Sequence, residues 1–551
     1  MAQSEADRRE AAPAPLFDAI VIGAGFAGMY MLYKLRDMGL SVQGFEAGGG
    51  VGGTWYWNRY PGARCDSETM YYSYSFLPDL ERDRPLEERY PGQAEILRYL
   101  NHVADRLDLR KDFRFDSRVA SITYDDSSGR WTVSATDGVS ASATYVVTAV
   151  GCLSAANTPW LPGQESFGGE TYHTGEWPHE PVSLAGKRVG IIGTGASGIQ
   201  AIPVIAAEAE QLTVFQRTAQ FTIPANNGPL DPQMVEMWKA NYREWHRRGR
   251  HSVGGYPFGA TDRSALDASP EERRGAYERC WEQGGFLFLF GAFGDLMIDE
   301  DANETVSDFI RSKIDEIVED SAVADMLKPY SFPFGTKRPP LDTNYYETFN
   351  RPNVTLVDLR RTPIEEVTPT GVRTSAAEHP LDVLVYATGF DALTGPLAAM
   401  GIRGRGGRSL DEEWSEGPRT YLGLAVPGFP NLFTITGPGS PSVLSNMPVS
   451  IEQHVEWIAD CIQHLRDNGI GQIEATDEAA ASWTDHVQEA ANQTLYPRAA
   501  SWYMGANIPG KPRLFLPYVG GVGVYRDKCD EVAANKYEGF KLRAPAMASH
   551  A

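Results

Sequence analysis

Two glycine-rich motifs in this chain have the spacing of a turn that binds a pyrophosphate. The first is Gly23-Ala24-Gly25-Phe26-Ala27-Gly28, which lies between an apolar run at 17–22 and a segment with helical spacing that extends to residue 38. Glycine permits a tight turn, close approach of the backbone to a phosphate and close packing of helix on strand. Glu46 ends the next apolar segment, where a carboxylate can bind the hydroxyls of a ribose. This motif therefore predicts a dinucleotide site rather than a structural glycine turn.

The second motif, Gly193-Thr194-Gly195-Ala196-Ser197-Gly198, repeats the order of strand, turn, helix and strand. Its second strand ends at Gln216-Arg217-Thr218, which offers a permanent cation instead of a carboxylate. A guanidinium favours the 2′-phosphate of NADP(H). Two such motifs imply two different cofactors, and we predict FAD at the first and NADP(H) at the second.

The cysteines narrow the redox chemistry. The five cysteines, at positions 65, 152, 280, 461 and 529, include no C-x-x-C pair, so they indicate neither a redox-active disulfide nor a zinc site, and we assign no metal. This usage is typical of a reducing cytoplasm, where we expect the protein to be located. A reduced flavin without a cysteine pair can pass electrons to oxygen, to a protein partner or to a small acceptor. We favour oxygen chemistry.

The order of strands and helices around the two glycine motifs predicts an α/β fold. It would have two Rossmann-like dinucleotide-binding domains, both discontinuous, and a helical insertion. The insertion is assigned because residues 230–327 are charged and helical in spacing, and because Ser269-Pro270-Glu271-Glu272 is typical of a helix start. We expect a disordered tail at 1–16, FAD-binding parts at 17–150 and 389–540, NADP-binding parts at 151–229 and 334–388, the insertion at 230–333 and a tail at 541–551.

Composition limits the partners. A hydrophobic content of 42% in 551 residues predicts large globular cores, and a net charge of −22 argues against nucleic acid and anionic membranes as partners. The one membrane-like run, at 17–35, contains the first glycine motif, which favours a buried strand and helix over a membrane span. We expect a monomer that binds small molecules.

Several segments resemble the Baeyer–Villiger monooxygenases, most closely the phenylacetone and steroid monooxygenases. Residues 167–178 (FGGETYHTGEWP) match the family signature, in which Trp177-Pro178 distinguishes it from related flavin N-oxygenases. A second motif extends from Gly52-Gly53-Thr54-Trp55 to Asp66, and the similarity covers roughly 18–540. The resemblance implies that NADPH reduces FAD, that oxygen adds at flavin C4a, and that the peroxide converts a ketone to an ester or lactone. The substrates would be a small-molecule ketone, cyclic, aryl or steroid-like, and O2.

The resemblance also implies roles for single residues. Arg338 matches the catalytic arginine, and Asp66 matches the carboxylate that positions it; a surface salt bridge and a loop-capping aspartate are the alternatives. Lys337 and Arg217 would bind the 2′-phosphate. The remaining matches are Thr54, Trp55, Tyr72, Val119 and Met447 for the flavin, Thr218, Ser197, Gln200 and Trp502 for NADP(H), and Val443, Leu444 and Met447 for the substrate.

Two positions are less clear. His173 lies in the signature but also in the connection between domains, so we favour a structural role over acid–base chemistry. Pro448 replaces an apolar residue of the relatives, which leaves the local shape of the substrate loop open. An N- or S-oxygenase, an NADPH oxidase or a nucleotide-binding redox sensor would use the same cofactor residues, although a mere sensor needs neither Arg338 nor Asp66.

Overall fold

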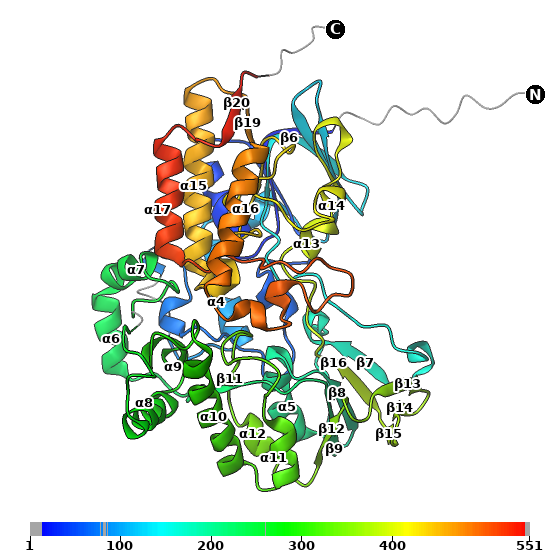
Figure 1. The fold of residues 1–551 in the computed structure, drawn as a ribbon. Coiled ribbons are helices and arrows are strands. Elements are labelled where there is room, and N and C mark those ends of the chain that lie inside the picture. The colour runs from blue at the N-terminus through cyan, green and yellow to red at the C-terminus, as the bar shows by residue number, and fades with distance from the viewer. Residues whose placement is uncertain (1–13, 78, 81–83, 85, 259–260, 546–551) are drawn as a thin grey trace, which may run out of the picture.

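The computed structural model describes residues 14–545, except 78, 81–83, 85, 259 and 260; the tail expected at 1–16 therefore lies almost wholly outside the described residues. Figure 1 shows two β-sheets in separate halves of the molecule. The upper half holds the sheet that includes β6, together with the C-terminal helices. The lower half holds the sheet of β7, β8, β9, β12 and β16, with a helical region beside it (Figure 1).

The first sheet has eight strands, in the order β17-β4-β5-β6-β1-β2-β3 with β18 paired to β6. Strand β1 is at its centre and is buried on both faces from Ala19 onward, as expected for an apolar run flanked by parallel neighbours. Strands β4, β5 and β6 form an antiparallel meander. The strands are β1 (Leu16–Ile22), β2 (Val42–Phe45), β3 (Phe113–Arg114), β4 (Val119–Asp125), β5 (Arg130–Ala135), β6 (Ser140–Thr148), β17 (Ile402–Arg403) and β18 (Leu432–Thr434).

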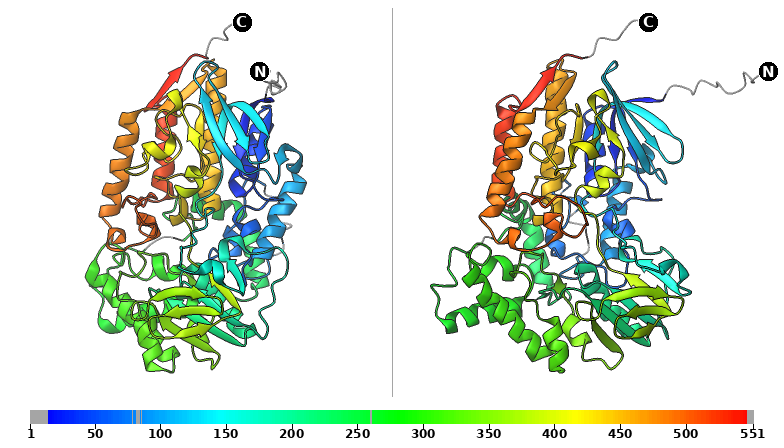
Figure 2. Two further views of the ribbon diagram at one scale, coloured as in Figure 1. Left: turned by 90° about the vertical axis from the view of Figure 1, so that its right-hand side faces the viewer. Right: turned by 45° about the vertical axis from the view of Figure 1, so that its right-hand side comes forward.

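Helices cover this sheet from both ends of the chain. Helix α1 follows the first glycine turn and packs against α15, which belongs to the C-terminal part of the sequence. Helices α15, α16 and α17 lie side by side along the upper half in both figures (Figures 1 and 2). The helices are α1 (Phe26–Asp37), α2 (Thr54–Trp57), α4 (Gln93–Arg106), α13 (Gly395–Ala398), α14 (Leu410–Glu413), α15 (Met447–Asp467), α16 (Asp477–Asn492) and α17 (Val522–Ala534).

The second sheet is entirely parallel, in the order β12-β9-β8-β16-β7. Helix α5 follows the second glycine turn, as α1 follows the first, and an antiparallel meander of β13, β14 and β15 lies beside the sheet. The elements are β7 (Glu170–His173), β8 (Arg188–Ile192), α5 (Ala196–Glu208), β9 (Gln211–Gln216), α12 (Tyr345–Thr348), β12 (Val354–Asp358), β13 (Ile364–Thr368), β14 (Gly371–Thr374), β15 (Glu378–Pro380) and β16 (Val383–Tyr386).

The region between these parts is helical, as predicted. Helix α8 begins with a capping box, because the Ser269 hydroxyl accepts from the Glu272 amide while the Glu272 carboxylate accepts from the Ser269 amide. Two short strands, β10 (Ile223–Pro224) and β11 (Leu341–Asp342), join the two ends of this region. The helices are α6 (Pro232–Ala240), α7 (Tyr242–Arg250), α8 (Pro270–Gln283), α9 (Leu287–Gly291), α10 (Glu300–Ile317) and α11 (Ser321–Leu327).

The α/β class with two Rossmann-like units is confirmed. The chain crosses between the two sheets at 151–157 and again at 388–391, and these crossings pair with each other: Ala156 and Phe390 form an antiparallel bridge. One expected boundary differs, because residues 541–543 belong to β20 (Phe540–Arg543), which pairs with β19 (Gln472–Ala475), rather than to a tail. Among the described residues, no helix has both the length and the apolar character needed to cross a membrane.

Candidate active site

The first glycine turn is shaped so that its open side can hold an anion. Gly23 has a φ of +105°, and a Cβ on Gly28 would lie 1.7 Å from the carbonyl oxygen of Gly23, so both positions require glycine. Gly25 begins α1 without a side-chain cap, which leaves the first amides of the helix available. These amides and the positive end of the helix dipole suit a pyrophosphate.

The second turn repeats this geometry closely. Gly193 has a φ of +110°, and a Cβ on Gly198 would lie 2.3 Å from the carbonyl oxygen of Gly193. A Cβ on Gly195 would meet nothing within 4 Å, so this glycine faces open space at the start of α5, where Ala196 and Ser197 follow. The Thr194 hydroxyl donates to the carbonyl of Thr218 at 2.9 Å, which joins the turn to the end of β9. The second turn thus also offers a cradle for a phosphate.

Glu46 stands directly after β2 and is oriented by the first turn. One carboxylate oxygen accepts from the Ala24 amide and the other from the Gly48 amide, each at 2.7 Å. Burial raises the pKa of this carboxyl, against the lowering effect of these two bonds. Each oxygen has a further lone pair, so the arrangement is compatible with the predicted ribose contact.

The residues matched to the flavin fall into two groups. Phe26, Trp55 and Tyr72 cluster beside the first turn: the Trp55 indole donates to the Tyr72 hydroxyl at 3.1 Å, and the Phe26 and Tyr72 rings meet edge to face at 5.2 Å. Thr54 begins α2 in the same loop. Val119 and Met447 are the first residues of β4 and α15. Met447 packs against the core that contains Phe26, Trp55 and Tyr72, whereas Val119 belongs to a separate core.

Two cationic side chains, those of Arg217 and Lys337, lie close to each other near the end of β9. Burial and the positive charge of Arg217 lower the pKa of the Lys337 ammonium to about 8. Its Nζ lies 4.4 Å from the centre of the Phe332 ring, and in the described part of the chain no carboxylate pairs with Lys337 or with Arg217. Two like charges without a counter-ion destabilise each other, so this donor set fits an anion such as a 2′-phosphate. Thr218 follows Arg217 in the chain, and its contact with NADP(H) stays a prediction.

Arg338 and Asp66 form a bidentate ion pair, although 272 positions separate them in the sequence. Nε donates to Oδ2 at 2.7 Å and Nη2 to Oδ1 at 2.8 Å. Nη1 donates to the backbone carbonyl of Val443 at 2.8 Å. A guanidinium has five N–H donors, so two remain that no group among the described residues accepts. The Arg338 side chain is 27% exposed, so part of it can be reached from outside the protein.

The surroundings of Arg338 keep it charged. Burial alone would lower its pKa, but the Asp66 carboxylate outweighs this effect and raises the pKa above its ordinary value. The Phe286 ring lies under the guanidinium, with 4.6 Å from Cζ to the ring centre. Tyr503 is buried beside Arg338, and Tyr256 is anchored by a 2.6 Å hydroxyl bond to Ser67.

These aromatic neighbours were missed in the sequence. Phe286 opens an apolar run in the helical region, and Tyr256 lies in a glycine-rich loop, so neither belongs to a recognisable motif. Only Tyr503 had a signal, because it follows Trp502. The rings of Trp502 and Tyr503 lie 4.2 Å apart, and their loop is fastened to the second crossing by an ion pair of Lys511 with Asp391.

The substrate-loop residues lie in one turn before α15. Val443 and Leu444 belong to the 3-10 helix η6 (Ser442–Leu444), and Met447 begins α15. Pro448 lies in the first turn of α15, where a missing amide hydrogen costs nothing, so it is compatible with the helix start. Of these loop residues, Val443 has a hydrogen bond to Arg338 among the described residues, and it accepts through its backbone carbonyl.

Two predicted residues have other partners here. The Gln200 amide accepts from the Tyr60 hydroxyl at 2.8 Å and donates to the Arg64 carbonyl at 3.0 Å, which ties α5 to the loop after α2, so its contact with NADP(H) stays a prediction. His173 accepts from the Gly175 amide at 3.0 Å and faces the Thr388 hydroxyl at 3.4 Å, while burial lowers its pKa. Its location beside the second crossing is compatible with the structural role that we expected.

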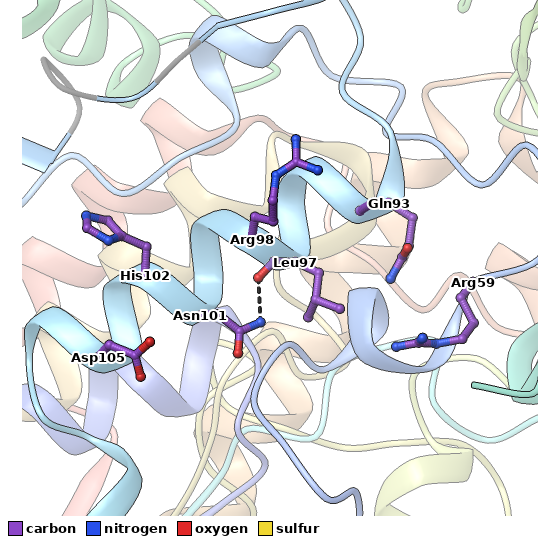
Figure 3. Close-up of a pocket in the computed structure, with 8 residues that line it drawn as sticks. Arg59, Gln93, Leu97, Arg98, Asn101, His102 and Asp105 are labelled. Atoms are coloured by element: carbon purple, nitrogen blue, oxygen red, sulfur yellow. Dashed lines mark hydrogen bonds between the residues drawn. The ribbon is translucent and has the colours of Figure 1, made fainter. Parts of the chain in front are cut away.

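A surface groove of about 560 Å³ lies elsewhere, over the outer face of α4 (Figure 3). It is lined mainly by polar residues of α4, with Arg59 at its edge. It includes none of the predicted site residues. Gln93 connects the two regions, because its amide donates to the Trp55 carbonyl at 2.5 Å.

Comparison with known proteins shows which family this chain resembles. The family model described as flavin-binding monooxygenase-like matches residues 18–230. A Baeyer–Villiger monooxygenase of Pseudooceanicola batsensis is 46% identical, over 95% of both chains. A phenazine N-monooxygenase of Lysobacter antibioticus is 45% identical, over 96% of this chain and 97% of its own.

The fold agrees as well. A solved structure of an oxidized steroid monooxygenase bound to NADP is 52% identical, with a TM-score of 0.91, and covers 96% of this chain and 99% of its own. The predicted cofactors, FAD and NADP(H), are confirmed. Sequence, fold and cofactors agree, and this chain belongs to the Baeyer–Villiger monooxygenases.

Proposed function

We propose that this enzyme uses NADPH and O2 to convert ketones, of cyclic, aryl or steroid-like type, to esters or lactones. The observation that supports this proposal most strongly is the geometry of the Arg338 guanidinium. It donates two hydrogen bonds to Asp66 and one to the Val443 carbonyl, and two of its donors are unused among the described residues. The flavin, when bound, would accept hydride from NADPH and activate dioxygen.

Arg338 would stabilise negative charge on the oxygen atoms of the reacting group. A preorganised donor in a site that excludes water is effective because it needs no reorganisation as charge develops. Arginine suits this task since it does not lose its proton, and Asp66 and Phe286 fix the plane of the guanidinium. Asp66 is a positioning residue in this scheme.

The second glycine turn, Arg217, Thr218 and Lys337 would bind NADP(H), with the two cations on the 2′-phosphate. Trp502 would reach the nicotinamide half, since its loop lies beside Arg338 through Tyr503. The first turn, Glu46 and the Phe26–Trp55–Tyr72 cluster would hold FAD. Each of these assignments is supported by the geometry of the groups that would contact the cofactor and by the family resemblance.

We also propose the division of the chain expected from the sequence, with FAD-binding parts at 17–150 and 389–540, NADP-binding parts at 151–229 and 334–388, and the insertion at 230–333. The composition of the two sheets supports this division. The five free, buried cysteines support a reducing cytoplasm as the location.

N-oxygenation is a second candidate, because the phenazine N-monooxygenase is nearly as similar to this chain as the Baeyer–Villiger relative. The two functions share their cofactors and differ in the acceptor. The discriminating experiment measures NADPH consumption with aliphatic, cyclic, aryl and steroid ketones and with aromatic N-heterocycles, with analysis of products and of hydrogen peroxide. Ester or lactone formed in proportion to NADPH supports the proposal; N-oxides alone, or peroxide alone, would refute it.

A further inference from the structure

Cys152 and Ser442 form a buried contact that no predicted role explains. The Cys152 sulfur lies 2.9 Å from the Ser442 hydroxyl oxygen and 3.3 Å from the carbonyl oxygen of Thr436. The Ser442 hydroxyl lies 3.4 Å from the same carbonyl. The exposed fractions are 4% for Cys152 and zero for Ser442, so water does not compete for these bonds.

The contact lies at the edge of the first sheet. Cys152 follows β6 and Thr436 follows β18, and these two strands are parallel neighbours whose carboxyl ends meet at one edge of the first sheet. Ligand sites of α/β proteins lie at such edges. The segment just after the second crossing also meets the first crossing there, because the Leu393 amide donates to the Cys152 carbonyl at 2.8 Å.

The backbone at Ser442 indicates that its hydroxyl is needed. Its φ is +44°, a left-handed conformation that is unfavourable for residues with a Cβ and that glycine adopts freely. A serine here therefore accepts a conformational cost that glycine would avoid. The hydrogen bonds of its hydroxyl offset this cost, since glycine could not make them.

The residue after Ser442 is the one that reaches Arg338. Val443 directs its carbonyl to Nη1 of Arg338 at 2.8 Å. The turn itself is closed locally, because the Ser445 hydroxyl and amide both donate to the Ser442 carbonyl, at 2.8 Å and 3.1 Å. The Ser442 side chain joins η6 to the sheet edge through its bonds with Cys152 and the Thr436 carbonyl.

We propose that Ser442, fastened by Cys152 and Thr436, is a positioning residue that sets the Val443 carbonyl and thereby the orientation of Arg338. This inference rests on the proposed function of Arg338. We expect that loss of the Ser442 hydrogen bonds would let the Arg338 guanidinium change its orientation while it stays paired with Asp66. Reduction of FAD by NADPH would continue, while transfer of oxygen to the ketone would become less efficient.

Four variants of the FAD-loaded enzyme test this. Ser442→Gly removes the hydroxyl and suits the backbone conformation, and Cys152→Ala removes its partner. Cys152→Ser keeps a hydrogen-bonding group, and Cys461→Ala is the matched control, because Cys461 is also fully buried but lies within α15 and has no role in the proposed site. The readouts are ester formed per NADPH consumed, the rate of FAD reduction, the Tm and hydrogen exchange of the Leu444 and Ser445 amides.

We expect Ser442→Gly and Cys152→Ala to lose roughly three- to tenfold in ester per NADPH, the value of one neutral buried hydrogen bond. Both should show faster exchange at the two amides, and the rate of FAD reduction should stay within about twofold of wild type. Cys152→Ser should restore most of the yield, and Cys461→Ala should retain it. If Cys152→Ala does not fold, Ser442→Gly decides alone.

Wild-type yield in Ser442→Gly, or an equal loss in Cys461→Ala, would overturn the positioning role. Failure of the wild-type enzyme to oxygenate any ketone would refute the proposed function instead. In that case amide exchange in Ser442→Gly still decides whether Ser442 fixes the turn, and unchanged exchange would overturn the inference on its own.

Discussion

Two hydrogen bonds join the guanidinium of Arg338 to the carboxylate of Asp66, because Nε donates to Oδ2 and Nη2 donates to Oδ1. A bidentate pair fixes orientation as well as distance. Asp66 therefore orients Arg338, while two donors of the guanidinium have no acceptor among the described residues.

Arg338→Ala should separate reduction from oxygenation. The variant should bind both cofactors and accept hydride, but lose about 100- to 1000-fold in ester formation, because removal of one preorganised donor costs roughly 3–4 kcal/mol. NADPH would then yield hydrogen peroxide. The measurement is ester per NADPH consumed, and a ratio near that of wild type would show that the charge comes from another group.

Asp66→Ala and Arg338→Lys test orientation separately from charge. Asp66→Ala keeps the cation but releases it, so we expect a smaller loss of ester than in Arg338→Ala. Arg338→Lys keeps a cation without the planar fork, and should rescue poorly because an ammonium cannot reproduce the bidentate pair with Asp66. Full activity of Arg338→Lys would mean that charge alone is sufficient.

Arg217→Ala should change the choice of nicotinamide cofactor. Each charge-assisted bond to the 2′-phosphate is worth about 1.5–3 kcal/mol, so its loss should raise the KM for NADPH by roughly tenfold or more. The KM for NADH should scarcely change, since NADH lacks that phosphate. Steady-state kinetics with both cofactors measure this, and equal use of both by the wild type would contradict the assignment.

Binding of NADPH should depend on pH through Lys337. Its pKa is lowered to about 8, and a phosphate beside it would raise the pKa again, so binding takes up a proton above that pH. The affinity for NADPH should be greatest below pH 8 and fall by up to about tenfold per pH unit above it. Binding of NADH should not show this dependence, and Lys337→Arg should abolish it. Titrations between about pH 7 and 9.5 measure it, and identical profiles for the two cofactors would exclude Lys337.

Glu46→Ala should weaken the retention of FAD. The substitution leaves the buried amides of Ala24 and Gly48 without an acceptor, which costs about 1–3 kcal/mol for each unless water replaces the carboxylate. The purified wild type should be yellow, and the variant should lose flavin on gel filtration. Glu46→Gln, which keeps an acceptor for one amide, should retain more flavin than Glu46→Ala.

Local sterics made much of the fold predictable. Gly28 and Gly198 are fixed by the carbonyls of Gly23 and Gly193 in their own turns, and the Ser269 cap is likewise local. The site was less predictable, because its contacts join distant segments through groups that have no sequence signal. The Val443 carbonyl is one such group. Gln200 shows the converse, since a motif does not reveal which helix face meets the neighbouring loop.

The position of β16 has a consequence for how the chain can be assembled. This strand, at 383–386, lies between β7 and β8, which are synthesised about 200 residues earlier by position in the chain. Until it emerges from the ribosome, β7 and β8 have no neighbour in common and each presents an unpaired edge, a hazard for aggregation. The lower sheet can close only after the entire helical region has been translated. A fragment that ends before Val383 would therefore pair only β8, β9 and β12 and would leave β7 unpaired, even though it contains the complete second glycine motif.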